Sequence, residues 1–181
     1  MTEKCRKVQL EIQALIEKAK KDGSFNATFF VLNPRNRIDK LKRAKGYVSL
    51  TVSTEKRSTY ISEMYIRKKE QGQALGSKLM HLAACFARKH RSGTLLAQIS
   101  CDGTEEDIER RRNFFIREKF ATDKSKVSSY AIRNICGVSE DRFDELGVKY
   151  LDASLCEFVK SICDEIKDDA LGRKSETGLE I

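Results

Sequence analysis

The turn around Gly72 and Gly76 holds the residue types best suited to bind an anion. The two glycines allow a tight turn in which backbone N–H groups approach a ligand, and a helix is expected to begin there. The first N–H groups of a helix lack intrahelical partners and lie at the positive end of its dipole. Lys68, Lys69 and Lys78 add positive charge around the turn. These features predict a site for a pyrophosphate.

Two well-known phosphate-binding motifs do not fit this turn. The spacing Gly72-x-x-x-Gly76-Ser77-Lys78 differs in gap and order from the Walker motif, and the Rossmann motif GxGxxG is absent from the chain. An ordinary strand-to-helix turn that contains glycine is the alternative when the turn is taken alone. A strand over 58–67 precedes the turn and a helix to about residue 91 follows it. A strand over 94–100 and a helix over 104–118 come next.

This series of elements, with two short motifs, resembles the GNAT superfamily of acyl-coenzyme A-dependent N-acyltransferases. The family motif, Gln/Arg-x-x-Gly-x-Gly/Ala, follows a strand and opens a helix, and here Gln71-Gly72-Gln73-Ala74-Leu75-Gly76 follows a strand that ends at Ile66. A later helix of the family ends in a phrase such as Phe-Tyr-x-x-x-Gly-Phe, and here Phe114-Phe115-Ile116-Arg117-Glu118-Lys119-Phe120 takes that place. The match spans residues 24–135. It implies a mixed α/β fold, with a GNAT-like central mixed β-sheet flanked by helices.

Three residues depart from the family pattern. Ala74 replaces the central glycine of the loop motif, and Lys119 replaces the glycine of the closing phrase. Phe115 replaces a tyrosine that protonates the leaving thiolate in many members. Because phenylalanine has no proton to give, a water, a nearby cysteine such as Cys101, or the amine's own proton would have to serve, or the chain does not catalyse the reaction.

The resemblance implies that acetyl-CoA, or another acyl-CoA, binds in a V-shaped gap between the strands 58–67 and 94–100. Backbone N–H groups near the end of the first strand would polarise the thioester carbonyl, as an oxyanion hole does. Loop N–H groups would hold the pyrophosphate. The expected cofactor-binding residues are Met64, Tyr65, Ile66, Gln71, Gly72, Gln73, Ala74, Leu75, Gly76, Ser77 and Phe115.

An acceptor amine must lose a proton before it attacks, and a positioned base contributes about 10²–10⁴-fold. Glu63 is the predicted catalytic base, because it is the only carboxylate on the strand 58–67 and a glutamate on that strand serves this role in some family members. The alternative is an exposed strand glutamate paired with a lysine. Asp102 is the second candidate for the base. His81 and His90 are expected at the surface.

The remaining sequence must position this segment. Apolar residues at helical spacing predict an N-terminal helix over 3–21, ended by Gly23. That stripe consists of Val8, Ile12, Leu15, Ile16 and Ala19. Residues rich in β-branched and aromatic side chains predict further strands over 24–33 and 46–54, with more strand material at Phe120 and 127–133. The core is therefore predicted as β-β-β-α-β-α-β, with one helix before it and two after.

The C-terminal part differs in charge from the rest. Residues 137–181 hold 12 acidic and 6 basic side chains, whereas residues 1–136 hold 15 acidic and 29 basic ones. Two helices are predicted here, starting near Ser139 and Ser154, with a loose polar tail from Gly172. The second has apolar residues on one side at Leu155, Phe158, Val159, Ile162 and Ile166. We expect a domain over 1–136 and an acidic helical extension over 137–181, which could fold back on the core, form a homodimer or cap the acceptor site.

The basic core bears on the partner. Six cations lie between Arg35 and Lys45, and such a field attracts a nucleic acid or the phosphates of a cofactor, although a solvated surface is the alternative. In the fold that the resemblance implies, this segment often forms a wall of the acceptor pocket. A positively charged wall would favour an acidic, phosphorylated or nucleic-acid-linked acceptor. Arg110, Arg111 and Arg112 could meet the 3′-phosphate of the cofactor if they border the mouth of the gap.

Several classes are excluded or disfavoured by composition. No window of the 181 residues is long and apolar enough for a transmembrane helix, and the charged N-terminus does not resemble a secretory signal, so we expect a cytoplasmic protein without a membrane partner. Six cysteines without a CxxC pair, and two histidines, predict reduced thiols and no metal site. The leading hypothesis is an N-acyltransferase that moves an acyl group from acyl-CoA directly to an amine. An acetyl group is the acyl group we expect first. The alternative is a catalytically idle GNAT-like module that binds a nucleic acid or a protein.

Overall fold

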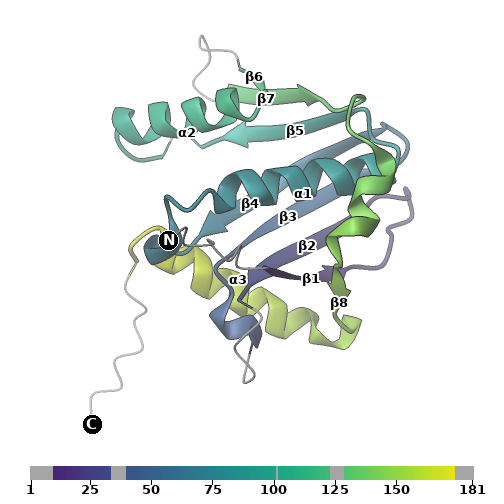
Figure 1. Ribbon diagram of the computed structural model, residues 1–181, viewed down its shortest axis with the longest axis horizontal. Helices are drawn as coiled ribbons and strands as arrows, with labels where there is room; N and C mark the ends of the chain where they lie inside the picture. The colour runs from purple at the N-terminus through teal and green to yellow at the C-terminus, as the bar shows by residue number, and fades with distance from the viewer. Residues whose placement is uncertain (1–9, 34–39, 101, 123–128, 174–181) are drawn as a thin grey trace, which may run out of the picture.

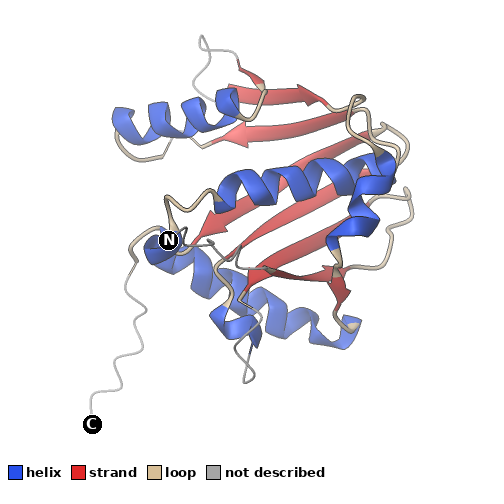
Figure 2. Cartoon of the chain, viewed as in Figure 1, coloured by secondary structure: helices blue, strands red, loops and turns tan. Residues whose placement is uncertain are grey.

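One mixed sheet organises the residues that the computed structural model describes, 10–33, 40–100, 102–122 and 129–173 (Figure 1, Figure 2). Its strand order is β6-β7-β5-β4-β3-β2-β1-β8. The strands are β1 (Glu11–Ile16), β2 (Phe25–Leu32), β3 (Gly46–Ser53), β4 (Ser58–Ile66), β5 (Thr94–Ile99), β6 (Ala121–Thr122), β7 (Ser129–Asn134) and β8 (Lys149–Tyr150). The pairs β4–β5 and β1–β8 are parallel, and the other neighbouring strands are antiparallel.

Helices cover both faces of this sheet. The α-helices are α1 (Leu75–Lys89), α2 (Glu105–Arg117) and α3 (Cys156–Ala170). The 3₁₀ helices are η1 (Lys40–Arg43), η2 (Lys68–Glu70), η3 (Glu140–Leu146) and η4 (Ala153–Leu155). The elements α1, α2 and η3 pack in one apolar core, and η1 and α3 pack in a second core across the sheet. The sequence prediction of a mixed α/β sheet flanked by helices is confirmed.

The central strands are apolar on both sides because each side faces a core. In β2, Phe29 and Val31 belong to the α1 core, whereas Phe30 and Leu32 belong to the α3 core. Consecutive side chains of a strand point to opposite faces, so an unbroken apolar run is what a doubly covered strand requires. The predicted strands 24–33, 46–54, 58–67 and 94–100 are confirmed to within one or two residues at each end.

The predicted N-terminal helix over 3–21 is wrong for its described residues, 10–21, none of which is helical; residues 11–16 form β1 between β2 and β8. Ile12, Ala14 and Ile16 face the α1 core, while Leu15 faces the α3 core. Three apolar residues therefore alternate along one face of the strand, and Leu15 lies on the other face. Over so few residues, the combined spacing of Ile12, Leu15 and Ile16 is the same as that of one face of a helix. Val8, part of the predicted stripe, lies outside the described residues.

Local signals placed α1 and α2 correctly. α2 starts with the predicted capping box, in which the Asp107 N–H donates to Thr104 Oγ1 (3.2 Å) and the Thr104 N–H donates to the Asp107 carboxylate (3.3 Å). These two bonds satisfy N–H groups that a helix end would otherwise leave without a partner.

The acidic C-terminal part packs on both faces of the sheet. The segment predicted to start a helix at Ser139 forms η3, whose Phe143 is buried against Phe29 and Phe86. Helix α3 lies on the other face, and its buried side chains are Val159, Ile162, Cys163 and Ile166. Leu155 and Phe158, predicted on the same stripe, remain 38% and 37% exposed. Among the described residues, no helix combines the length and apolar character needed to cross a bilayer.

Ile166→Ala should destabilise the protein by about 3 kcal/mol, because Ile166 is fully buried where α3 packs on the sheet. Phe158→Ala on the same helix is the matched control and should cost less than about 1 kcal/mol. Urea denaturation of both variants measures the two free energies of unfolding. Equal small losses would show that α3 does not pack on the sheet.

Candidate functional site

The main opening in the sheet lies between two parallel strands that separate along their length. β4 and β5 pair only through Ser58–Ile61 and Thr94–Ala97. Beyond these residues β4 continues to Ile66 and β5 to Ile99 without pairing to each other. The end of β4 therefore keeps one edge whose backbone groups have no neighbouring strand. The predicted V-shaped gap lies at this position.

A β-bulge in β4 accompanies the separation. Ile61 pairs with Leu50 and Glu63 pairs with Ser49, so Ser62 is an extra residue on β4. The Ser62 hydroxyl donates to the Ser49 carbonyl oxygen at 3.0 Å and holds the bulge. A bulge bends its strand and increases the local twist, which turns the end of β4 away from β5.

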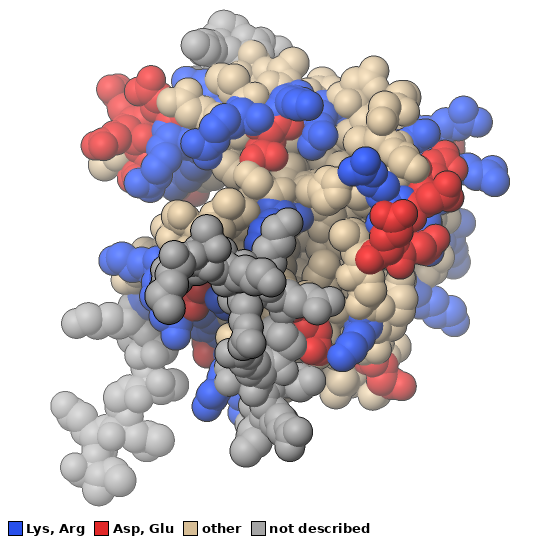
Figure 3. Space-filling view, in the orientation of Figure 1, with Lys and Arg blue, Asp and Glu red and all other residues tan. Residues whose placement is uncertain are grey.

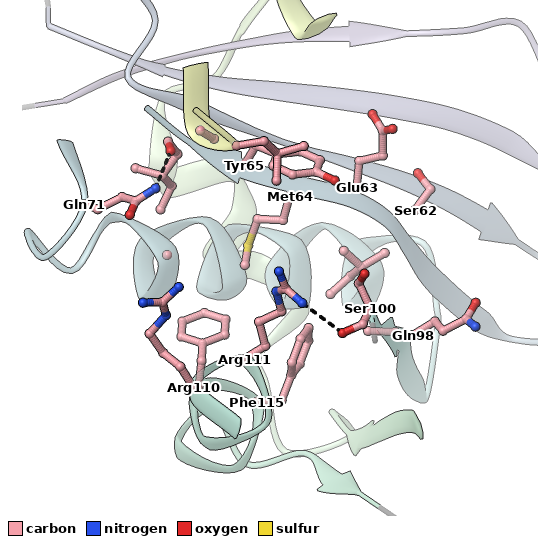
Figure 4. A pocket seen from close by; sticks show the side chains of 17 residues that line it. Ser62, Glu63, Met64, Tyr65, Gln71, Gln98, Ser100, Arg110, Arg111 and Phe115 are labelled. Atoms are coloured by element: carbon pink, nitrogen blue, oxygen red, sulfur yellow. Dashed lines mark hydrogen bonds between the residues drawn. The ribbon is translucent and has the colours of Figure 1, made fainter. Parts of the chain in front are cut away.

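The gap contains a cavity of 430 Å³ (Figure 4). Its walls come from the end of β4, the end of β5, the loop before α1, helix α2 and the end of α3. The lining residues are Ile61, Ser62, Glu63, Met64, Tyr65, Ile66, Gln71, Gly76, Ala97, Gln98, Ser100, Arg110, Arg111, Phe114, Phe115, Ala170 and Leu171.

Backbone N–H groups of β4 are directed into this gap. The Arg67 N–H donates to the Lys45 carbonyl on the β3 side at 2.9 Å. Because N–H directions alternate along a strand, the N–H groups of Met64 and Ile66 point to the opposite edge, toward β5. The Ile66 carbonyl accepts a hydrogen bond from Gln71 Nε2 at 3.0 Å, which ties the loop to the end of the strand. Of the predicted oxyanion residues, Met64 and Ile66 therefore offer N–H groups, whereas the Tyr65 N–H faces β3.

The loop from β4 to α1 ends at a helix N-terminus that no side chain caps. Gly72 and Ala74 adopt left-handed φ values of 81° and 59°, and α1 begins at Leu75 without a capping side chain. A second cavity of 400 Å³ lies against this loop and shares Ile66, Gln71, Gly76 and Phe114 with the first. Uncapped N–H groups beside a cavity can bind an anion.

Gly76 has a packing role in addition to its predicted place in the loop. A Cβ built on Gly76 would lie 3.0 Å from Cε2 of Phe114 on α2. A larger residue at position 76 would therefore require the Phe114 ring to shift. The Ser77 hydroxyl donates to the Glu118 carboxylate, so the backbone N–H is the group that Ser77 can offer to a ligand.

Arginines of α2 border the two cavities. Arg110 and Arg111 line the first cavity, and Arg117 lines the second. Arg111 Nη1 donates to the carbonyl oxygens of Ser100 (3.1 Å) and Asp102, which fixes α2 to the end of β5. Figure 3 shows a concentration of Lys and Arg side chains on the α2 side of the molecule. An anionic ligand fits here, because two cavities that share lining residues, an uncapped helix N-terminus and three arginines lie together.

Glu63 is held on the α3 side of β4. Its Oε2 accepts a hydrogen bond from the Tyr47 hydroxyl at 2.9 Å, and its Oε1 accepts one from Lys167 Nζ at 3.2 Å. Burial, together with the charge of Glu63, raises the pKa of Tyr47 and raises the pKa of Cys163 to about 12. Its hydrogen bond with Glu63 also raises the pKa of Lys167. The Glu63 side chain is 38% exposed, and the residue lines the cavity. It lies beside the gap and is also paired with a lysine, so its position agrees with both interpretations of the sequence.

Phe115 lies in an aromatic group at the wall of the cavity. Its ring centroid lies 5.6 Å from that of Phe114 and 5.2 Å from that of Phe120. Ser100 is a hydroxyl-bearing residue of the same wall. Cys101, the alternative proton donor expected from the sequence, lies outside the described residues.

The other titratable candidates lie away from this centre. Asp102 is exposed, and its carboxylate accepts a hydrogen bond from the Ser100 hydroxyl at 3.2 Å. His81 is exposed on α1, as expected. His90 differs from the expectation, because its ring centroid lies 4.5 Å from that of Phe86 and 5.0 Å from that of Phe25. Its partial burial lowers the pKa of His90. No three His, Cys, Asp or Glu side chains of the described ranges come together as a metal site.

Sequence reasoning missed the residues that α3 brings to the site. Lys167 contacts Glu63, and Ala170 and Leu171 line the cavity, although α3 follows β4 by about 100 positions in the chain. The helical spacing of the apolar residues of α3 was visible in the sequence. No signal in it connected this helix with the gap, because such pairing depends on where the helix packs.

Comparison with known proteins shows the family of the chain. The model of the acetyltransferase (GNAT) family matches residues 15–115, more than half of the chain, and the protein belongs to that family. This class of protein transfers acyl groups from acyl-CoA. No curated protein matches the chain.

Solved structures with a similar fold share little sequence. A GNAT-family acetyltransferase from Staphylococcus aureus is 13% identical, with a TM-score of 0.47, and the match covers 61% of this chain and 68% of that one. An acetyltransferase from Bacillus cereus is 14% identical, with a TM-score of 0.46 and coverage of 62% and 75%. Tetrahymena GCN5 is 12% identical, with a TM-score of 0.47 and coverage of 64% and 71%.

Ala74→Gly should stabilise the protein by about 0.5–1 kcal/mol, because Ala74 has a left-handed φ of 59° that costs an L-residue energy and glycine none. Ala83→Gly, in the middle of α1, is the control and should destabilise by about 1 kcal/mol or more. Thermal and urea unfolding measure both changes. A loss of stability of similar size in the two variants would contradict the left-handed conformation at Ala74.

Proposed function

We propose that this protein is an N-acetyltransferase that moves the acyl group of acetyl-CoA directly to an amine. The observation that carries the proposal is the pair of joined cavities, which leads from the uncapped N-terminus of α1 to the separated edges of β4 and β5. Family membership supports acyl transfer in general. The acetyl group and the amine acceptor are the finer part of the proposal, which the experiments below test.

The loop residues suit the diphosphate part of the cofactor. Loop residues between Gln71 and Ser77 line the cavity at the start of α1, and Arg117 lines the same cavity. Gly72 offers an approach without obstruction, since a Cβ built there would meet nothing within 4 Å. Gln73, Ala74, Leu75 and Gly76 complete the turn. Arg110 and Arg111 would meet further phosphate groups at the mouth.

The end of β4 suits the reacting end of the cofactor. When acetyl-CoA is bound, it supplies a thioester whose carbonyl carbon accepts the amine. The N–H groups of Met64 and Ile66 would stabilise the negative charge that develops on the thioester oxygen. Phe115 and Phe114 form an apolar wall beside this point, which excludes water and strengthens these hydrogen bonds.

Glu63 would take the proton from the attacking amine. Glu63 lines the same cavity, and its carboxylate is held by Tyr47 and Lys167 on the α3 face of β4. Because Phe115 carries no hydroxyl, the leaving thiolate would take a proton from the amine itself or from water. A side chain acid equivalent to tyrosine is not required for this transfer, since the amine loses two protons in forming an amide.

The acceptor would enter from the sheet face opposite α1. Leu95, Ala97 and Ile99 face the α1 core, so Gln98 projects to the other face of β5, where it is exposed. Tyr130 and Ile132 of β7 are also exposed there, at 59% and 48%.

The cations between η1 and β3 and at the end of β4 bear on the kind of acceptor. Arg67 donates to the carbonyls of Lys42 and Ala44, each at 2.8 Å, and Lys45 pairs with Glu70 at 3.3 Å. These contacts place cations next to the loop. They favour an acceptor that carries acidic or phosphate groups, including one linked to a nucleic acid.

Acetyl-CoA should bind in titration calorimetry, and Gln73→Glu should weaken this binding roughly tenfold, because a carboxylate would lie beside the diphosphate. Lys56→Gln makes the same change of net charge at the β3–β4 turn, about 30 Å from the loop along β4. This control should bind as the unchanged protein does. Absence of binding by the unchanged protein would overturn the cofactor site.

Turnover should appear as release of free thiol from acetyl-CoA when a panel of amines is supplied, among them acidic and phosphorylated ones. Glu63→Gln should lower kcat by roughly a hundredfold with little change in the Kd of acetyl-CoA, because only proton removal is impaired. Glu55→Gln in the β3–β4 turn is the control. An unchanged kcat would remove Glu63 from its role, and binding without turnover by any amine would favour the idle binding module, which the absence of a hydroxyl at residue 115 also supports.

A further inference from the structure

An amine of the chain itself lies where an acceptor amine is expected. Lys167 Nζ is 3.2 Å from Glu63 Oε1 and 5.6 Å from the centre of the Tyr65 ring. Ala170 and Leu171, which follow Lys167 by about one helical turn, line the cavity between β4 and β5. A primary amine that contacts the base beside the gap satisfies the first requirement of an acyl acceptor.

Lys167 is held in this position by contacts on both sides of it. The Asp169 carboxylate accepts a hydrogen bond from the Lys68 N–H at 3.0 Å, just after β4. Glu165 forms an ion pair with Arg67 at 3.4 Å, and Ile166 is fully buried. The end of α3 is therefore fastened to the end of β4 and to the start of the loop that precedes α1.

The geometry also brings the amine close to the reacting point. Glu63 and Tyr65 are alternate residues of β4, so their side chains share one face, and the N–H of Met64 between them points into the gap. Alternate residues of a strand are about 7 Å apart, and Lys167 Nζ contacts both. The Lys167 side chain is 33% exposed and has a flexible four-carbon stem, and an attack by this amine requires a rotamer change that carries it from Glu63 into the gap.

We propose that Lys167 is a self-acylation site, modified in cis by the acyl-CoA that this cavity binds; the inference rests on the proposed function. The Lys167 ammonium gives one proton to Glu63, and its nitrogen forms a bond to the thioester carbonyl carbon. The carbon–sulfur bond breaks, the sulfur takes the second proton from the nitrogen, and coenzyme A leaves as the free thiol. Glu63 then returns its proton to water, so the products are an amide, a thiol and one proton.

Two consequences follow from the contacts of Lys167. Its hydrogen bond to Glu63 favours the ammonium form, so the reactive neutral amine is scarce and the modification is slow compared with transfer to a free amine. Once acylated, Lys167 carries no charge, and Glu63 Oε1 loses its cationic partner. The carboxylate is then free to contact an amine that enters from outside. Self-acylation would thus exchange an internal amine for an external one at the same carboxylate.

Lys160 provides a matched control on the same helix. It lies two turns before Lys167, forms an ion pair with Glu157 at 3.5 Å, and has a side chain that is 62% exposed. Direct chemical acetylation by acetyl-CoA in solution would favour this more exposed lysine. Acetylation within the site favours Lys167, because a positioned base and a bound thioester act only there.

The experiment incubates the full chain with acetyl-CoA and follows acetylation of the Lys167 and Lys160 peptides by mass spectrometry. Lys167 should be modified roughly a hundredfold faster than Lys160, at a first-order rate that does not depend on protein concentration. Gln73→Glu should slow modification of Lys167 roughly tenfold at subsaturating acetyl-CoA and leave Lys160 unchanged. Lys167→Arg, which keeps a cation beside Glu63, should abolish the fast phase seen in the intact mass.

Equal rates at the two lysines, or faster modification of Lys160, would overturn the inference. If acetyl-CoA binds in calorimetry and a free amine is acetylated while Lys167 stays unmodified, the self-acylation fails and the proposed function stands. If acetyl-CoA does not bind, both fail. A rate that rises with protein concentration would show transfer between molecules and would contradict modification in cis.

Discussion

The incomplete pairing of β4 is the constraint on which the site depends. This strand is hydrogen-bonded along its whole length to β3 but only over four residues to β5. A parallel pair that separates leaves N–H groups without partners, and these groups must bind water or a ligand. The bulge at Ser62 makes this separation compatible with an intact sheet. The same backbone that forms the core of the fold therefore also supplies the donors of a candidate oxyanion hole.

The two sides of β4 divide the chemistry. On the α1 side, Met64 and Ile66 face the apolar core, and the uncapped helix α1 follows after η2 and the loop. On the α3 side, Glu63 lies among Tyr47, Lys167 and Cys163. A cofactor and an acceptor can thus approach one strand from opposite faces. The strand side-chain alternation produces this division without any additional element.

The acidic C-terminal part contributes to the core of the protein and to its site. Phe143 of η3 packs on α1, while Ile162 and Ile166 of α3 cover the other face of the sheet. The negative charge of this part is directed toward cations near β4 and the loop, through the pairs Glu165–Arg67 and Asp169 with the Lys68 N–H. The asymmetry of charge along the sequence therefore becomes, in part, a set of contacts within the fold.

The sequence by itself determined the elements with strong local signals and the family that they resemble. The strand β2 could be predicted from its unbroken run of apolar and aromatic residues, and the loop glycines and the capping box at Thr104 could be predicted because they depend on near neighbours. β1 was mistaken for a helix. Leu15 and Ile16 face opposite sides of the sheet, and both are apolar because a core covers each side, which the sequence does not show. The contact between Glu63 and Lys167 joins residues 104 positions apart. Only the tertiary structure decided it, because the packing of α3 on the sheet brings these two side chains together.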